Sequence, residues 1–308
     1  MNNMLNCFNN FSCIKGDCKK SCCTLWKVNI DKKTLRKYKR VKGDFKEKIN
    51  SGVDFKCASF NMKEGRCAFF NNDSLCDLII NLGEKSLCEV CAIHPRFINK
   101  LKSYTETGVG IACEEGARLL LSFKDKITPA LSPNIKKLKG FEKEIILFRQ
   151  TVLQIIYGNA TLSEKVKKIL SLLEVDENAF ISLPYLDKLS KMEVLDSDWK
   201  ERLKFFNKIT LEIENENELL NLLVYFIYRH LITAVDKLDL KAKTLFSIFS
   251  TLTIHNIYIN SKKVQKDISL LSNIARDYSA EIEYSEDNLF SLFDLFEEFI
   301  LKSEIKNS

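Results

Sequence analysis

Residues 13–23 read CIKGDCKKSCC, and residues 67–91 read CAFFNNDSLCDLIINLGEKSLCEVC. Together with Cys113, these two stretches hold nine of the eleven cysteines of the 308-residue chain. The 195 residues that follow Cys113 contain none. This break in composition predicts a cysteine-built domain over residues 1–125, followed by a domain of a different kind.

Three explanations for the cysteines compete. Disulfides need an oxidising compartment, and an odd number of cysteines without a recognisable secretory signal argues against them. Buried structural thiols, which pack like small hydrophobic groups, explain the isolated Cys7 and Cys57 but not the remaining nine. We therefore predict a metal site, and the candidate ligands are Cys13, Cys18, Cys22, Cys23, Cys67, Cys76, Cys88, Cys91 and Cys113.

The spacing of these cysteines bears on the kind of metal. Structural zinc sites usually present two short CxxC pairs, and here Cys88 and Cys91 form the one clean pair. Iron–sulfur clusters accept four thiolates at more irregular spacings, so an iron–sulfur cluster of the 4Fe-4S type is favoured and zinc is the alternative. His94 is a further candidate ligand, although a lone histidine before a proline is more often a packed loop residue.

The remainder of the chain has the period of helices. Apolar residues recur at steps of three and four from Phe141 to Ile155, and a capping box begins a second helix at Thr161. Further helices are expected around Trp199, over 219–235, and near 239–258, 262–280 and 286–302. The expected fold is therefore mainly α: an irregular cysteine-rich metal-binding domain over 1–125 and an all-helical bundle over 138–308. The boundary is placed at 125–138, where two of the four prolines stand.

Charge and hydropathy limit the functional classes. Residues 1–125 hold 22 Lys and Arg against 14 Asp and Glu, an excess of 8 that is larger than the net +6 of the whole chain. The basic run 32–40 is interpreted as a solvated helix face, because Leu35 and Tyr38 punctuate it at helical spacing, and nucleic-acid binding is not expected. The longest apolar run, 219–228, is too short to cross a bilayer and is interrupted by Asn221. A cytoplasmic protein without a transmembrane segment is expected.

The cysteine region also resembles a known family. The match is carried by FSCIKGDC at 11–18, SCC at 21–23 with Trp26, IDKKT at 30–34, RCAFF at 66–70, LC at 75–76, LGE at 82–84, LC at 87–88 with Cys91, PR at 95–96 and ACEEGAR at 112–118. These segments resemble the flagellin lysine-N-methylases, which belong to a wider group of zinc- or iron-chelating cysteine-cluster proteins. The segment ELLNLLVYFIYRH at 218–230 resembles the helix with paired tyrosines in those enzymes.

The resemblance implies transfer of a methyl group from S-adenosylmethionine to lysine side chains of flagellin, with an iron–sulfur cluster required. Lysine must lose a proton before it can act as a nucleophile, so Glu84 and Glu89 are candidate bases, and Tyr225 and Tyr228 are candidates for lining a substrate groove. The competing interpretations are solvated glutamates and core tyrosines. No glycine-rich nucleotide turn and no CxxxCxxC motif occurs, so any S-adenosylmethionine site must be atypical. The alternative function is a non-enzymatic metal-chelating protein that docks a partner through its helical domain.

Overall fold

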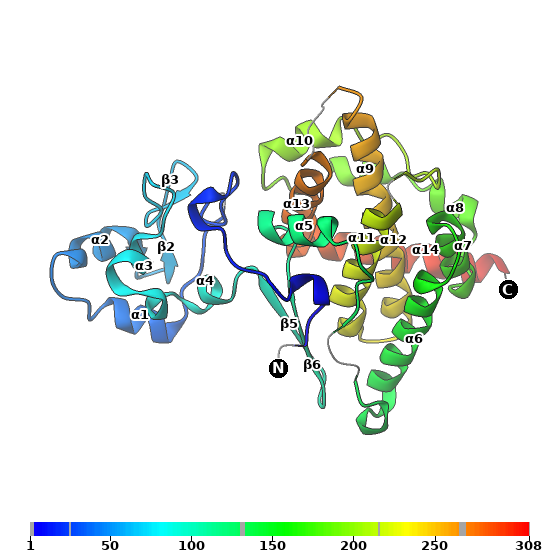
Figure 1. Cartoon of the computed structure of the whole chain (residues 1–308), viewed down its shortest axis with the longest axis horizontal. Helices are drawn as coiled ribbons and strands as arrows, with labels where there is room; N and C mark the ends of the chain where they lie inside the picture. The colour runs from blue at the N-terminus through cyan, green and yellow to red at the C-terminus, as the bar shows by residue number, and fades with distance from the viewer. Residues whose placement is uncertain (1–2, 25, 130–132, 215, 265–268, 308) are drawn as a thin grey trace. The chain divides into compact units, whose positions relative to one another are not determined.

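The chain forms two compact units in a computed structural model that describes residues 3–24, 26–129, 133–214, 216–264 and 269–307 (Figure 1). The smaller unit comprises Ser12–Phe97 and Cys113–Glu115. The larger unit comprises Met1–Phe11, Ile98–Ala112 and Gly116–Ser308. All nine predicted ligand cysteines fall in the smaller unit, and Cys7 falls in the larger one.

Short elements build the smaller unit (blue and cyan in Figure 1). Its helices are η2 (Lys15–Asp17), α1 (Lys32–Tyr38), α2 (Phe45–Gly52), α3 (Asp77–Leu82), η3 (Glu84–Ser86) and α4 (Glu89–Ile93). Two antiparallel hairpins accompany them, β1 (Val53–Asp54) with β2 (Ser59–Phe60) and β3 (Met62–Lys63) with β4 (Arg66–Cys67). The core packs Phe60 edge-on to Phe69 at 5.4 Å between ring centroids. Gly52 lies so close to the Phe69 ring that a Cβ there would stand 2.5 Å from it.

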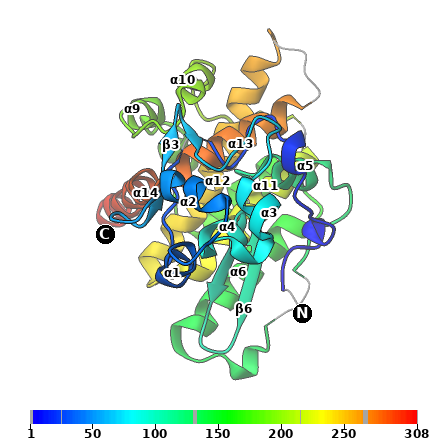
Figure 2. The same cartoon turned by 90° about the vertical axis from the view of Figure 1, so that its left-hand side faces the viewer.

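The larger unit is helical. The elements that lie wholly within it, from residue 105 onward, are β6 (Thr105–Val109), η4 (Ile135–Lys137), α6 (Gly140–Tyr157), α7 (Leu162–Leu172), α8 (Glu177–Ile181), α9 (Tyr185–Ser190), α10 (Ser197–Leu203), α11 (Glu216–His230), η5 (Leu231–Thr233), α12 (Lys237–Ser261), α13 (Leu270–Ile282) and α14 (Glu286–Asn307). Strand β5 (Arg96–Lys100), which pairs with β6, and helix α5 (Glu114–Ser122) both begin in the smaller unit and end in the larger. The 3-10 turn η1 (Asn6–Phe8) precedes them. Helix α12 packs against α11, α13 and α14 (Figures 1 and 2).

The helical part agrees with the sequence prediction where the signals are local. Helix α6 ends before Gly158, and the capping box predicted at Thr161 and Glu164 is present at the start of α7. Helix α11 is buried on almost every side, as its apolar composition predicts, but it ends at His230 and not at residue 235. The segment predicted at 262–280 forms a helix from residue 270 onward, and its residues 265–268 lie outside the described ranges. The chain is therefore mainly α, as expected.

The division into units does not follow the predicted boundary at 125–138, of which residues 130–132 lie outside the described ranges. Residues 3–11 and 98–112 belong with the helices, because long-range hydrogen bonds hold them there. The Thr107 N–H donates to the Asn3 carbonyl at 2.7 Å, and the Tyr228 hydroxyl donates to the same carbonyl at 2.9 Å. None of the described helices is long and apolar enough to cross a membrane.

Candidate functional site

Four of the cysteines gather in the core of the smaller unit. Cys88 is fully buried, and Cys67, Cys76 and Cys91 pack against the same hydrophobic cluster. Cys23 joins them through the backbone, because the Cys67 N–H donates to the Cys23 carbonyl at 2.9 Å and Thr24 forms an antiparallel bridge with Arg66. Five thiols from two separate stretches of chain are thereby brought into one neighbourhood.

Burial raises the pKa of Cys67 and of Cys76, and backbone N–H groups two and three residues further along the chain act in the opposite direction. At Cys88, the backbone N–H groups of Cys91 and Val90 help to lower the pKa. A backbone N–H also acts on Cys13, whose sulfur accepts the Lys15 N–H at 3.4 Å. Backbone N–H groups aimed at sulfur stabilise the thiolate, which is the form that binds metals and clusters.

Cys88 and Cys91 interact directly across the start of α4. A hydrogen bond from the Cys91 thiol lowers the pKa of Cys88 to about 7, against the opposing effect of burial, and the same bond raises the pKa of Cys91. Asp31 fixes the position of this helix, since its carboxylate accepts the Thr34 N–H at 2.9 Å and the Glu89 N–H at 3.0 Å. Burial alone would raise the pKa of Asp31, but these two bonds lower it. One carboxylate thus joins the starts of α1 and α4.

A second set of thiols lies around Cys18. Burial, and then the nearby Cys113, Glu114 and Cys13 groups, raise the pKa of Cys18 to about 12. The Glu114 carboxylate ties residues 113–115 to this loop, because it accepts the backbone N–H groups of Lys19 at 2.8 Å and Lys20 at 3.3 Å. Cys113 is therefore placed beside a loop that lies almost a hundred residues earlier in the sequence.

The adjacent Cys22 and Cys23 differ in their surroundings. A hydrogen bond from Cys22 lowers the pKa of Cys23 to about 7, whereas the same bond, burial and the nearby Cys13 and Cys113 raise the pKa of Cys22. All eleven cysteines are free thiols. Within the described ranges, no three or more His, Cys, Asp or Glu side chains are arranged so that they could hold a metal ion.

The other sequence-predicted residues of this unit lie at its surface. Glu84 and Glu89 are exposed, Glu84 in η3 and Glu89 as the first residue of α4. The His94 ring contacts Trp26 at 5.6 Å between centroids, as a packed loop residue does. Cys57 is exposed in the turn between β1 and β2, so the interpretation of this residue as a buried structural thiol is wrong. Its backbone N–H donates a hydrogen bond to the Asp54 carboxylate within this turn.

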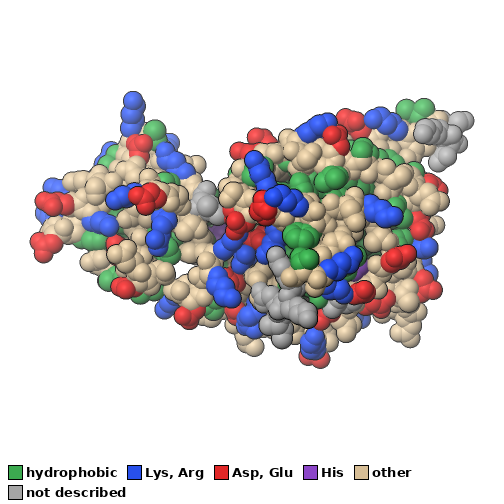
Figure 3. Space-filling view, turned by 90° about the horizontal axis from the view of Figure 1, so that it is seen from above, with side chains coloured by type: hydrophobic (Ala, Val, Ile, Leu, Met, Phe, Trp, Pro, Cys, Tyr) green, Lys and Arg blue, Asp and Glu red, His purple; other side chains and the backbone are tan. Residues whose placement is uncertain are grey.

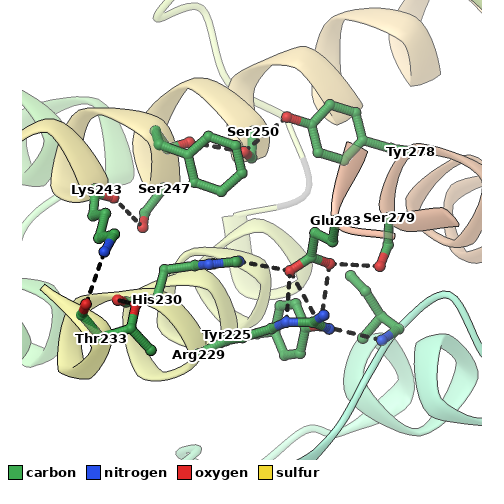
Figure 4. Close-up of polar contacts among 12 residues, drawn as sticks. Tyr225, Arg229, His230, Thr233, Lys243, Ser247, Ser250, Tyr278, Ser279 and Glu283 are labelled. Carbon is green, nitrogen blue, oxygen red and sulfur yellow. Dashed lines mark hydrogen bonds and ion pairs between the residues drawn. The ribbon is translucent and has the colours of Figure 1, made fainter. Parts of the chain in front are cut away.

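Tyr225 and Tyr228 lie in the larger unit and are fully buried. The Tyr225 hydroxyl donates to Glu283 at 3.2 Å and accepts from the Arg229 guanidinium at 2.6 Å (Figure 4). It also accepts the Ile111 N–H at 3.2 Å. Both tyrosines are thus held as hydrogen-bonded core residues of α11, and neither lines an open groove in this unit.

Glu283 is the centre of a buried polar network that the sequence analysis missed (Figure 4). Its carboxylate contacts Arg229 at 3.1 Å and His230 at 2.7 Å and accepts the Ser279 hydroxyl. Burial alone would raise the pKa of Glu283, but Arg229 and His230 lower it, so the carboxylate is ionised. The Arg229-His230 dipeptide at the end of an otherwise apolar helix was the one signal of such a network, because buried cations require partners.

On the face drawn in Figure 3, Lys and Arg side chains are interspersed with Asp and Glu. Helix α1 does form in the basic run, with Thr34 and Tyr38 buried and the cations of 32–40 exposed.

The chain forms a thiol-rich unit of short elements and a helical unit, and comparisons with known proteins show what it is similar to. The chain is 25% identical to a lysine-N-methylase of Salmonella typhimurium over 174 residues, which are 53% of this chain and 38% of that protein. It is 27% identical to the flagellar biosynthetic protein FliU of Salmonella muenchen over 148 residues, which are 45% of this chain and 84% of that protein. The resemblance to lysine-N-methylases predicted from the sequence is confirmed at this level of similarity.

The extent of the similarity is limited. The chain spans 38% of the length of the lysine-N-methylase that it matches. No family model matches the sequence. No solved structure is significantly similar to it.

Proposed function

We propose that this protein transfers methyl groups from S-adenosylmethionine to lysine side chains of flagellin, in the cytoplasm, and that thiols of the smaller unit hold an iron–sulfur cluster required for the activity. The observation that carries the proposal is the similarity, over about half of the chain, to proteins named lysine-N-methylase. The similarity to a flagellar biosynthetic protein supports a flagellar substrate.

The donor set supports the cluster. The nine thiols lie in one unit and are soft ligands, and the Cys13 sulfur accepts a backbone N–H group, an interaction that tunes the charge and potential of iron–sulfur sites. Zinc is the alternative metal for the same thiols. The described side chains form no group that could already hold a metal ion, and metal binding is commonly coupled to local folding.

The chain's own residues must bind the substrate lysine and remove its proton. The thiols of the smaller unit would hold the cluster, and the cluster would supply a binding position for the amino and carboxylate groups of S-adenosylmethionine. Glu89 stands between two of the thiols in sequence and is exposed, and Glu84 is exposed in η3, so either carboxylate can accept a proton from a lysine ammonium group. The basic surface of α1 would receive acidic residues of the substrate protein.

The test is methyl transfer in vitro. Protein purified without oxygen is incubated with flagellin and S-adenosylmethionine that carries a labelled methyl group, and label in flagellin lysines is measured. Either Glu84→Gln or Glu89→Gln should slow transfer about 100-fold, as loss of a general base does, whereas the exposed control Glu47→Gln should not. If metal-loaded protein leaves no label in the lysines of flagellin, the proposed activity is excluded. Full activity in both variants would exclude these carboxylates as bases.

A second candidate is the alternative that the sequence left open for the same thiols, a function without catalysis. In that case the protein would be a metal-chelating module that docks a partner through its helical unit. Equilibrium dialysis against S-adenosylmethionine separates the two functions, because the methyltransferase must retain this molecule and the module need not.

A further inference from the structure

The positive charge of the chain lies in the smaller unit. This unit holds 18 Lys and Arg against 12 Asp and Glu, an excess of 6 that equals the net charge of the whole chain, so the larger unit is balanced. The excess is concentrated in residues 32–43, which contain seven cations and no acidic residue. All seven of these side chains are exposed. A surface that carries one sign of charge attracts partners of the opposite sign.

Four of these cations cover the exposed side of helix α1, and we call them the α1 basic face: Lys32, Lys33, Arg36 and Lys37. The opposite side of the helix is buried through Thr34 and Tyr38. The face contains two pairs of cations at the i, i+4 spacing, at which like charges repel and destabilise a helix. Within the part of the chain that the structure describes, none of the four cations forms an ion pair. The fold therefore leaves this repulsion uncompensated, and an acidic partner would relieve it.

Hydrogen bonds at both ends hold α1 against the segment 86–89. At its start, the Asp31 carboxylate, which caps the helix, accepts the Glu89 N–H at 3.0 Å. At its end, the Tyr38 hydroxyl donates to the Ser86 carbonyl at 2.8 Å. Helix α1 is thereby fixed beside the segment that carries Glu89, one of the two candidate bases. A protein bound to the α1 basic face would lie next to that segment.

The composition of α1 favours a protein partner over a nucleic acid or a membrane. The apolar residues between its cations are Leu35, which is half-buried, and Tyr38, which is buried, and both pack in the hydrophobic core. Over this helix, all of which the structure describes, no ring is offered for stacking on bases and no apolar side chain for insertion into a bilayer. The cations act by charge alone, which suits carboxylates on a protein surface.

We propose that the α1 basic face is a docking surface for acidic residues that flank the target lysine in the substrate protein. The inference rests on the proposed function insofar as the substrate is a lysine-containing protein. It adds the class of substrate, which is lysines in acidic surroundings, and it assigns their selection to the four cations of the face. These side chains bind and orient the substrate and do not touch the reacting atoms.

Binding of two peptides to the full-length protein tests the surface without methyl transfer. The peptides share one central lysine and differ in having either aspartate or asparagine on both sides of it. Fluorescence anisotropy of a dye on each peptide measures the dissociation constant. At low ionic strength the aspartate peptide should bind about 10-fold more tightly than the asparagine peptide. The difference should disappear at about 1 M salt, where the screening length is about 3 Å.

The decisive variant combines Lys33→Gln, Arg36→Gln and Lys37→Gln. It should bind the aspartate peptide no more tightly than the asparagine peptide, because the charges that select the carboxylates are gone. Its midpoint of urea unfolding, followed by Trp26 fluorescence, should be unchanged or higher, because repelling charges have been removed from the helix. A loss of binding in a folded variant is therefore a loss of the surface.

The matched control combines Lys136→Gln, Lys137→Gln and Lys139→Gln. These three exposed cations belong to the larger unit, so the control changes the net charge by the same amount away from α1. It should keep the preference for the aspartate peptide. In methyl transfer to flagellin, the α1 variant should raise KM about 10-fold and leave kcat unchanged, as loss of a binding interaction does.

The outcomes distinguish the docking surface from the proposed function. If the α1 variant binds the aspartate peptide as tightly as wild type, or if the control loses the preference equally, the docking surface is wrong. Tighter binding of wild type to single-stranded RNA or to vesicles of anionic lipid than to the aspartate peptide would overturn the choice of partner. If wild type and the variants show the expected preference but flagellin is not methylated, the proposed function is wrong and the surface is upheld as a site for acidic peptides.

Discussion

Breaking the buried ion pair between Glu106 and Arg149 should strongly destabilise the larger unit. Glu106 on β6 is fully buried and Arg149 on α6 is 3% exposed, and the guanidinium binds the carboxylate with two hydrogen bonds, one of 2.7 Å. Burial alone would lower the pKa of Arg149, but Glu106 raises it, so the cation persists in the interior. Glu106→Gln removes the negative charge and leaves the positive charge buried without its partner. The cost of breaking such a pair is about 3–5 kcal/mol.

The size of this effect can be measured against two controls. Glu144 on the same helix forms an exposed pair with Lys237 at 3.6 Å, so Glu144→Gln should cost about 1 kcal/mol or less. Replacing both partners, with Glu106→Leu and Arg149→Met, should recover most of the lost stability because no charge is then left buried. The proportion recovered separates the cost of an unpaired charge from the cost of altered packing.

The assay must report on the larger unit alone, because two units need not unfold together. Trp199 is buried in the larger unit, and Trp26 lies in the smaller one. Urea unfolding followed by fluorescence in a Trp26→Phe background therefore reports the free energy of unfolding of the larger unit. A loss in Glu106→Gln no larger than that in Glu144→Gln would refute the reasoning, and so would failure of the double replacement to recover stability.

Two further predictions concern packing and pH. Gly52→Ala should destabilise the smaller unit by about 1–3 kcal/mol, because the added methyl group would meet the Phe69 ring at 2.5 Å. The control Ser51→Ala, on the exposed side of α2, should cost less than about 0.5 kcal/mol. Urea unfolding followed by Trp26 fluorescence measures both free energies, and equal effects would contradict the packing. Burial lowers the pKa of His255 from 6.5 to about 4. As the pH falls, the unfolded chain therefore binds a proton at this residue before the folded chain does, and the free energy of unfolding decreases below pH 6.5. The decrease between pH 7 and pH 5 is about 2 kcal/mol. His255→Leu should remove that part of the pH dependence of unfolding, and an unchanged pH dependence would show that His255 is not its source.

The sequence predicts those parts of the fold whose causes are local. The capping box at Thr161 and the apolar period of α6 depend on residues a few positions apart, and both are present. The pairing of Glu283 with Tyr225 spans 58 residues, and nothing near either residue indicates the other. The same reason explains why residues 3–11 were assigned to the cysteine region, since their bonds to Thr107 and Tyr228 are long-range.

The thiols illustrate the same limit within the candidate site. Their number and spacing mark them as a set, but the pattern does not tell which thiols lie together. Cys113 joins Cys18 only because Glu114 is bound by the backbone of residues 19 and 20. Cys57, which the sequence could not distinguish from a buried thiol, is exposed in a turn where its N–H donates to Asp54.

The central claim is that the thiols of the smaller unit hold an iron–sulfur cluster. The most direct measurement is iron and acid-labile sulfide per chain in protein prepared entirely without oxygen. We expect brown protein with iron and sulfide in equal amounts, about four of each per cluster. Colourless protein with stoichiometric zinc and no sulfide would contradict the claim.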